Sequence, residues 1–285
     1  MKYVRIIPRL DIKGPNLVKG IHLEGLRVLG KPEDFAKLYY EQGADELIYQ
    51  DTVASLYQRN NLTDIITRTA KNIFIPITVG GGLRTLEDIN TVLRAGADKV
   101  AINTVAIQNP KFITEASRAF GSSTVVVAIE TIKQPDGSYL AYTDNGREYT
   151  GIDAILWAKE VEELGAGEIL MTSIDQEGTG DGFDLNLIQQ ISDLLTIPII
   201  AHGGAGTEKH VYNVIKKSGA EAVAISSMLH YSALKSNSSL ADNYKSEGNI
   251  EFLKKKGTFK TFGKENISEI KSQLKKQNIL LRTTN

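Results

Sequence analysis

Two glycine-rich turns in this sequence each end a short apolar run. Gly80–Gly82 ends one such run and Gly203-Gly204 ends another. Because glycine leaves the backbone N–H groups uncovered, an anion such as a phosphate can approach these turns closely. Asn103-Thr104 and Ser226-Ser227 follow the next apolar run in each case and offer further hydrogen-bond donors. These residue types and spacings predict two phosphate sites.

Two carboxyl groups end other apolar runs. Ile7, Arg9 and Asp11 are spaced two residues apart along the first run, and Ala128 and Glu130 have the same spacing along a later one. Strand alternation would turn both carboxyls toward the same interior, facing each other between the two phosphate sites. Such a pair suits general acid and general base work on the middle of a ligand that has a phosphate at each end.

The elements that must position these groups occur twice. Residues 76–104 read as strand, glycine turn, helix and strand, and residues 198–227 repeat the pattern at an offset of 122 or 123 residues. Two similar halves of four βα units predict an α/β protein with a (β/α)8 barrel, in which the chemistry lies at the C-terminal ends of the strands. We expect one domain over residues 1–285, with an insertion after strand 8 at about 232–266.

The segments between these units give further expectations. Residues 134–150 predict a β-hairpin with its turn at PDGSY, whereas residues 13–29 and 52–61 are expected to be loops. Lys19, in the first loop, is either a solvated lysine or a clamp that folds over a phosphate. The insertion is either solvated, with one short helix at 250–256, or it covers the substrate or binds a partner. We expect strands at 4–12, 46–51, 124–130 and 168–172, and helices at 32–42, 62–71, 109–120, 151–164, 185–195 and 267–277.

Composition excludes several classes of function. Lys and Arg number 33 against 34 for Asp and Glu, so net charge favours neither nucleic acid nor a membrane surface. There is no Cys for a disulfide, a thiolate metal site or a nucleophile. Residues 175–182 are acidic and glycine-rich but lack EF-hand spacing, so we expect no metal and no cofactor. The charged first strand is unlike a signal segment, and a soluble cytoplasmic protein is expected.

Over nearly its whole length, apart from the insertion, the chain resembles the cyclase subunit of imidazole glycerol phosphate synthase, the HisF family. The matching segments are residues 5–14, 17–20, 43–51, 75–85, 96–103, 125–130, 158–175 and 203–206. The resemblance implies a barrel that pairs with a glutaminase subunit, similar to HisH. Ammonia made by that partner would pass through the barrel and react with a bis-phosphorylated ribulosyl aminoimidazole intermediate. The products would be imidazole glycerol phosphate and an aminoimidazole carboxamide ribotide.

The resemblance also implies residue roles. Asp11 matches the catalytic acid/base, with Glu130 as the second carboxyl, and Lys19 matches a mobile-loop lysine. One phosphate site would contain Gly82, Asn103 and Thr104, and the other Gly178, Gly204, Ser226 and Ser227. A charged ring that gates ammonia at the barrel floor would consist of Arg5, Glu46, Lys99 and Glu168, although the same four could simply be ion pairs that close the floor. Asp98 would touch the glutaminase.

Four positions at the mouth depart from the family pattern. Glu130 and Glu177 stand where the family has Asp, Arg9 where it has a small Cys, and His202 where it has Ser. An unpaired buried arginine would be untenable, so we expect Arg9 to pair with Glu130, to lower the pKa of that carboxyl and to make it a poor general acid. His202 is either a satisfied rim histidine or a contact to phosphate or base.

Two functions therefore compete. The first is the cyclase subunit in histidine biosynthesis. The second is an ammonia conduit that joins a glutaminase to a separate amidotransferase in bacterial surface-sugar (acetamidino sugar) biosynthesis, with weak or no cyclase activity. A related sugar isomerase of the histidine pathway shares the barrel and the phosphate sites. It needs no ammonia route, so the charged ring argues against it.

Overall fold

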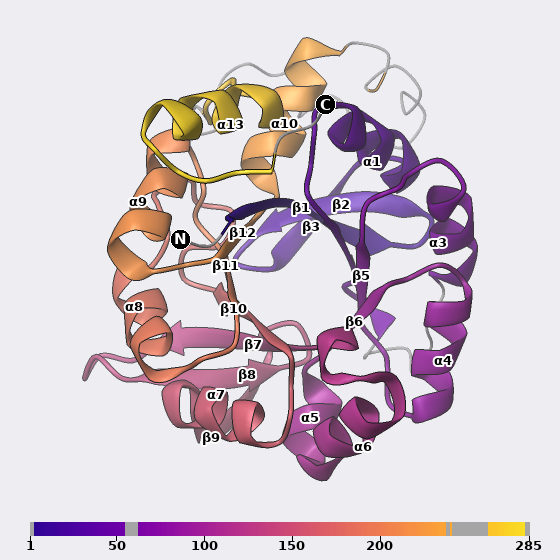
Figure 1. Cartoon of the computed structure of the whole chain (residues 1–285), viewed down its shortest axis with the longest axis vertical. Helices are drawn as coiled ribbons and strands as arrows, with labels where there is room; N and C mark the ends of the chain where they lie inside the picture. The colour runs from indigo at the N-terminus through magenta and orange to yellow at the C-terminus, as the bar shows by residue number, and fades with distance from the viewer. Residues whose placement is uncertain (1–2, 55–61, 238–239, 241–261, 283–285) are drawn as a thin grey trace.

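Eight parallel strands close into a ring in this computed structural model, which describes residues 3–54, 62–237, 240 and 262–282 (Figure 1). The ring strands are β1 (Arg5–Lys13), β4 (Leu47–Asp51), β5 (Ile77–Gly80), β6 (Lys99–Ile102), β7 (Val125–Lys133), β10 (Glu168–Ser173), β11 (Ile199–His202) and β12 (Ala222–Ile225). Each strand pairs in parallel with the next, and pairing of β7 with β10 completes the circle. The predicted (β/α)8 fold class is confirmed.

Helices cover the outside of this ring (Figure 1). They are α1 (Pro32–Glu41), α3 (Thr63–Ala70), α4 (Leu86–Arg94), α5 (Thr104–Gln108), α6 (Lys111–Phe120), α7 (Ala154–Glu163), α8 (Leu185–Leu194), α9 (Glu208–Ser218), α10 (Ser227–Ser236) and α13 (Ile267–Lys276). Local signals define their starts: Thr85 and Asp88 form a capping box at α4, and the Asp153 side chain caps α7.

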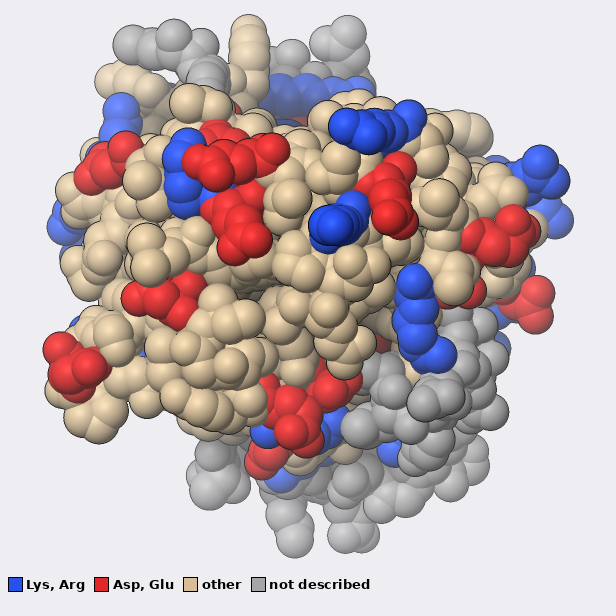
Figure 2. All heavy atoms as spheres, turned by 90° about the horizontal axis from the view of Figure 1, so that it is seen from below, with Lys and Arg blue, Asp and Glu red and all other residues tan. Residues whose placement is uncertain are grey.

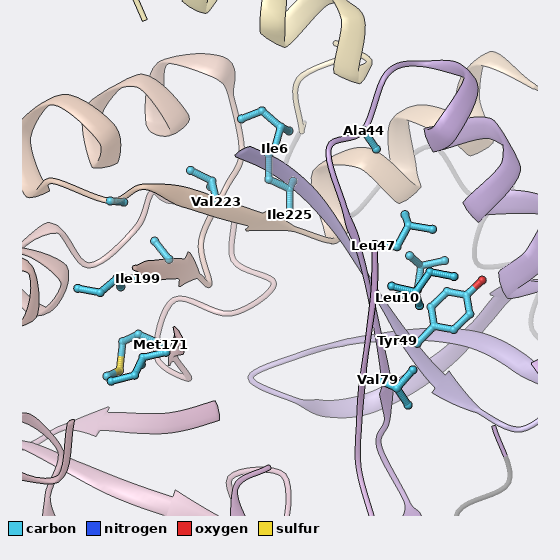
Figure 3. Packing of buried hydrophobic residues seen from close by; sticks show 14 of the residues in the cluster. Ile6, Leu10, Ala44, Leu47, Tyr49, Val79, Met171, Ile199, Val223 and Ile225 are labelled. Atoms are coloured by element: carbon cyan, nitrogen blue, oxygen red, sulfur yellow. The ribbon is translucent and has the colours of Figure 1, made fainter. Parts of the chain in front are cut away.

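Strand alternation divides the buried residues into two layers. Ile6 and Leu10 of β1 point outward into the apolar layer beneath the helices, in which Leu10 lies near Tyr49 (Figure 3). Ile7 and Arg9, which alternate with these residues, point inward, as predicted for this strand. The inward layer is Ile7, Ile48, Ala101, Val126, Ala128, Leu170, Ile200, Ala222 and Ala224.

Two segments differ from expectation. The loop predicted at 13–29 is wrong, because these residues form β2 (Asn16–Ile21) and β3 (Glu24–Gly30), a hairpin that extends β1. The predicted hairpin at 134–150 is present as β8 (Tyr139–Thr143) and β9 (Glu148–Asp153). Its PDGSY segment, however, turns the chain from β7 into β8 rather than from β8 into β9.

The insertion is described only at its two ends. The expected helix at 250–256, most of 232–266 and the loop at 55–61 lie outside the described residues. Helix α10 continues past Ser232 to Ser236, and Phe262 at the far end stacks on Tyr231 with ring centroids 5.4 Å apart. The Gly263 amide donates to the Gly206 carbonyl at 2.8 Å. The insertion therefore ends against the loop after β11, at the mouth of the barrel.

The surface agrees with the balanced composition. Lys, Arg, Asp and Glu alternate on the face shown in Figure 2, without a broad field of one sign. Among the described helices, none combines the length and the apolar character that crossing a bilayer demands.

Candidate active site

The two glycine turns lie at the same end of the barrel, because β5 and β11 both belong to the parallel ring. Gly81 has φ 98° and Gly203 has φ 100°, values that glycine adopts without steric cost. Asn103 and Ser226, which follow β6 and β12, also match, with φ, ψ of −130°, −78° and −116°, −86°. The backbones of the two halves therefore agree at the points where the predicted phosphate sites lie.

One half of the mouth, which we call the open half, contains a cavity of about 260 Å³. Gly82, Asn103 and Thr104, the residues predicted for the first phosphate site, line this cavity together with Glu130. Further lining residues with polar side chains were not predicted, among them Asp51, Arg84, Asp144 and Asn145. The signal available for two of them was the Asp144-Asn145-Gly146 turn, whose composition favours positive φ.

Glu130 ends the inward row of β7 and is buried, with 5 % of its surface exposed. Its Oε2 accepts hydrogen bonds from Asn103 Nδ2 at 3.3 Å and from the Gly146 amide at 2.9 Å. Burial raises the pKa of Glu130 to about 7, although the charge of Arg9 and the Gly146 amide both act to lower it. This carboxyl can therefore gain or lose a proton near neutral pH.

The other half of the mouth, the closed half, contains the residues predicted for the second phosphate site. Gly178, Gly204, Ser226 and Ser227 surround a cavity of only about 10 Å³. That is about the space for one water molecule. The Gly182 amide donates to the Gly204 carbonyl at 2.7 Å, so the loop after β10 lies directly on the glycine turn. A phosphate has no room here in this conformation.

Asp11 lies beside the closed half, held between two cations. Its Oδ1 accepts from Arg9 Nε at 2.9 Å and its Oδ2 from Lys19 Nζ at 2.8 Å. Lys19 also pairs with Glu177, so these four charges form one buried network. Burial raises the pKa of Asp11, but the charges of Lys19 and Arg9 outweigh burial and hold that pKa well below its usual range. Asp11 is therefore a carboxylate at any physiological pH.

The expected pair between Arg9 and Glu130 is wrong, and so is the expected fall in the pKa of Glu130. Arg9 reaches Asp11, two residues away on the same face of β1, instead of crossing to β7. The lysine expected in a loop is also different, because Lys19 lies on β2 with 1 % of its side chain exposed. The solvated lysine is therefore wrong, and the phosphate clamp stays a prediction.

The Nδ1 atom of His202 has hydrogen-bond partners within the same network. Its Nδ1 lies 3.1 Å from Arg9 Nη1 and 3.2 Å from Thr172 Oγ1. Arginine can only donate, so His202 Nδ1 must accept and the imidazole proton is on Nε2. Burial, and then the charge of Arg9, lower the pKa of His202 well below its usual value, which keeps the ring neutral. Arg9 Nη2 is buried without a hydrogen-bond partner.

The predicted ring forms at the opposite end, the floor of the barrel. Arg5 pairs with Glu46 at 2.7 Å and with Glu168, and Lys99 pairs with the same two carboxylates at 3.1 Å each. Cations and anions alternate around this ring, so every charge has two partners of opposite sign. A gate for ammonia and a set of ion pairs that only closes the floor would both have this geometry, so both alternatives stay open.

Asp98 precedes β6 at this floor, and its carboxylate accepts from the Ile77 amide at 2.9 Å. Asp45 does the same for Ile6 at 2.8 Å and also pairs with Lys271 of α13 at 2.7 Å. The Asp45–Lys271 pair was not predicted, because the two residues are far apart in sequence and Lys271 lies in no motif. Asp98 thus has a structural bond of its own, whether or not a partner contacts it.

The comparisons with known proteins agree with this architecture. A family model described as "Histidine biosynthesis protein" matches residues 5–235. This chain belongs to that family. Its relatives include three proteins named "Imidazole glycerol phosphate synthase subunit HisF". One from Legionella pneumophila is 61 % identical over 206 residues, which is 72 % of this chain and 97 % of the relative.

The other two family members are more distant. The protein from Methanococcus vannielii is 48 % identical over 247 residues, covering 80 % of this chain and 91 % of its own. The protein from Prochlorococcus marinus is 47 % identical over 232 residues, covering 81 % and 91 %. The predicted resemblance to the HisF family is therefore confirmed.

Proposed function

We propose that this barrel is the cyclase subunit of an imidazole glycerol phosphate synthase in histidine biosynthesis. The names of relatives that are 47–61 % identical support this function. The structural observation that supports it best is the alternating ring of charges at one end of the barrel, opposite the paired glycine turns at the other. A cytoplasmic location goes with such a biosynthetic role.

In this proposal the substrate is the bis-phosphorylated ribulosyl aminoimidazole intermediate. Gly82, Asn103 and Thr104 bind one phosphate in the open half. Gly178, Gly204, Ser226 and Ser227 bind the other after the Lys19 network and its neighbouring loops move aside, since their cavity is now too small. Asp11 and Glu130 lie between the two ends of the substrate.

Ammonia enters from a glutaminase subunit that docks at the floor and contacts Asp98. Tyr3 and Phe74, which precede β1 and β5 at this end, are 66 % and 75 % exposed and suit such a contact. Above the ring the interior contains small side chains, among them Ala101 and Ala128, and both also line the cavity of the open half. A route past these two alanines would end beside Glu130, which lines the same cavity.

Turnover of the purified barrel tests the proposal. The barrel is given the ribulosyl intermediate with an ammonium salt, and loss of substrate absorbance is followed. We expect turnover, and we expect it to become glutamine-dependent when a HisH-type subunit is added. Lys99→Met should uncouple glutamine use from product formation while turnover with ammonium salt remains, and Lys37→Met on the exposed face of α1 serves as the control.

The second candidate, the conduit in surface-sugar amidation, gives the opposite result. A folded barrel that binds a glutaminase yet leaves the intermediate untouched would favour that function. The buried Asp11 pairs and the small cavity of the closed half are the observations on its side. The names of the relatives favour the cyclase.

A further inference from the structure

Gln50 of β4 points into the barrel. Its chain neighbour Tyr49 belongs to the outward apolar layer, so strand alternation turns Gln50 the other way (Figure 3). Gly80 of β5 follows Val79 of the outward layer and also faces inward. Gln50 is in register with Gly80, and Gly80 is in register with Ala101 of β6. One carboxamide therefore lies beside two inward positions that have almost no side chain.

The missing side chain at Gly80 makes room for the Gln50 amide. A Cβ placed on Gly80 would lie 2.3 Å from Gln50 Oε1 and 3.1 Å from Ala101 Cβ, so the amide oxygen and the alanine methyl group border the same small space. Gly80 lies outside the left-handed region that Gly81 occupies, so its backbone conformation does not require glycine. What requires glycine at this position is the Gln50 carboxamide beside it.

The Gln50 carboxamide is available to a ligand. Within residues 3–54, 62–237, 240 and 262–282, no group forms a hydrogen bond with this side chain. Gln50 is half-buried and lines the cavity of the open half together with Ala101, Ala128 and Glu130. A carboxamide has an acceptor oxygen and two N–H donors. A small polar molecule at this part of the cavity wall would give them partners.

We propose that Gln50 is an ammonia-binding residue, which receives ammonia where the route past Ala101 and Ala128 reaches the cavity. This inference rests on the proposed cyclase function and deepens it. The Gln50 Oε1 accepts a hydrogen bond from an N–H of ammonia, while the lone pair on the ammonia nitrogen stays free to attack the ligand. No covalent bond to Gln50 forms or breaks.

The surroundings of Gln50 suit neutral ammonia. Ala101 and Ala128 have no polar side-chain atoms, so they cannot hold it. Glu130 already accepts two hydrogen bonds at its Oε2, and as a carboxylate it would favour ammonium, which has no lone pair for attack. A neutral carboxamide binds ammonia without favouring its protonation. The residues predicted for the first phosphate site follow β5 and β6 instead of lying within a strand, so the phosphate does not need this amide.

The test compares Gln50→Leu with Gln190→Leu, a matched change on the exposed side of α8. Turnover of the ribulosyl intermediate is measured against free ammonia at constant pH and ionic strength. We expect Gln50→Leu to raise KM for ammonia by about two- to tenfold, with kcat and the KM for the ribulosyl intermediate within about twofold of the wild type. An unchanged KM for ammonia, or a raised KM for the intermediate instead, overturns the proposal.

A second set of variants tests the contact with Gly80. Gly80→Ala should displace the carboxamide and raise KM for ammonia, as Gln50→Leu does. In a Gln50→Ala background the added methyl group no longer meets the amide, so Gly80→Ala should then change KM for ammonia by less than about twofold. If Gly80→Ala has the same effect in both backgrounds, Gly80 does not act through Gln50 and the proposal is wrong.

Proton–nitrogen NMR tests ammonia binding without turnover. The side-chain amide signals of Gln50, identified by their absence in Gln50→Leu, should shift as free ammonia rises at constant pH, whereas those of Gln190 should not. Without that shift the role of Gln50 is overturned, whether or not the intermediate is converted. A shift in a barrel that leaves the ribulosyl intermediate untouched contradicts the cyclase function and supports ammonia binding, so the two failures remain distinguishable.

Discussion

The open and closed halves of the barrel mouth share a backbone but differ in what their side chains do. Both have a left-handed glycine turn and a polar residue before a helix in matching conformations. The open half keeps a cavity with one neutralisable carboxyl, whereas the closed half is filled by the buried charges around Asp11. A duplicated scaffold therefore sets where ligands can bind, and the charges placed on it decide which half is ready to bind them.

The largest change in stability should appear when the buried network of the closed half loses a cation. Lys19→Met leaves Asp11 and Glu177 with one fewer cation in a site without solvent, so we expect a loss of about 3–5 kcal/mol in the free energy of unfolding. Lys37→Met removes an exposed pair with Glu41 and should change stability by less than about 0.5 kcal/mol. Urea unfolding followed by circular dichroism measures both, and equal losses would contradict a buried network.

That network also shows where prediction from sequence ends. The repeat, the strand alternation and the floor ring could all be predicted, because they depend on local periodicity and on motifs that lie on consecutive strands. The partner of Arg9 could not be predicted, because Asp11 and Glu130 were both within plausible reach from the pattern alone. Arg9 also contacts Thr172 of β10 and His202 of β11, and the pattern of β1 reveals neither contact.

The hairpin β2–β3 was itself missed for a physical reason. Its sequence contains Gly14-Pro15, Gly20 and Gly25, residues that normally indicate a loop. Pairing with β1 overrides this local preference, since Asp11 is in register with Val18. The hairpin also brings Lys19 to Glu177, next to Gly178 of the second phosphate site. The sequence therefore predicted the residues of both sites but not that one of them is closed.

The shared backbone can be tested by adding a methyl group to each turn. At Gly81 a Cβ would lie 2.3 Å from the Asp51 carbonyl, and at Gly204 it would lie 1.9 Å from the Gly182 carbonyl. We expect Gly81→Ala and Gly204→Ala each to destabilise the fold by about 2–4 kcal/mol. Gly137→Ala has a similar φ of 90° but no neighbour within 4 Å, so it should lose only the conformational part, about 1 kcal/mol. Thermal unfolding measures the stability of each variant. If only one of the two turn variants is destabilised, the backbones of the two halves do not impose the same requirement for glycine.

The pH dependence of stability should distinguish the two carboxyls by sign. The pKa of Glu130 is raised to about 7, so between about pH 4.5 and 7 the native state retains a proton that the unfolded chain has lost, and stability falls as pH rises. Asp11 has a lowered pKa, so its contribution is present above about pH 3.8 and is lost only as pH falls below that value.

The measurement is the free energy of unfolding at pH 5 and at pH 8, in the wild type and in Glu130→Gln. The fall between these values should be about 1–3 kcal/mol smaller in the variant. His202 has a lowered pKa and contributes with the opposite sign below about pH 6.5, so the difference between the two proteins is the quantity to compare. Identical slopes would show that Glu130 is ionised throughout.

The smallest expected effect concerns a single hydroxyl in each half. Inorganic phosphate should bind the open half first, where Thr104 lines a cavity large enough to hold it. Thr104→Val removes one donor and should weaken phosphate binding by about 0.5–1.5 kcal/mol, roughly a two- to tenfold change in Kd. Ser227→Ala removes the corresponding donor where the cavity is about 10 Å³, so it should leave phosphate binding unchanged. Calorimetric titration of both variants measures the two values of Kd. If Ser227→Ala rather than Thr104→Val weakens phosphate binding, the closed half binds phosphate first and the prediction is wrong.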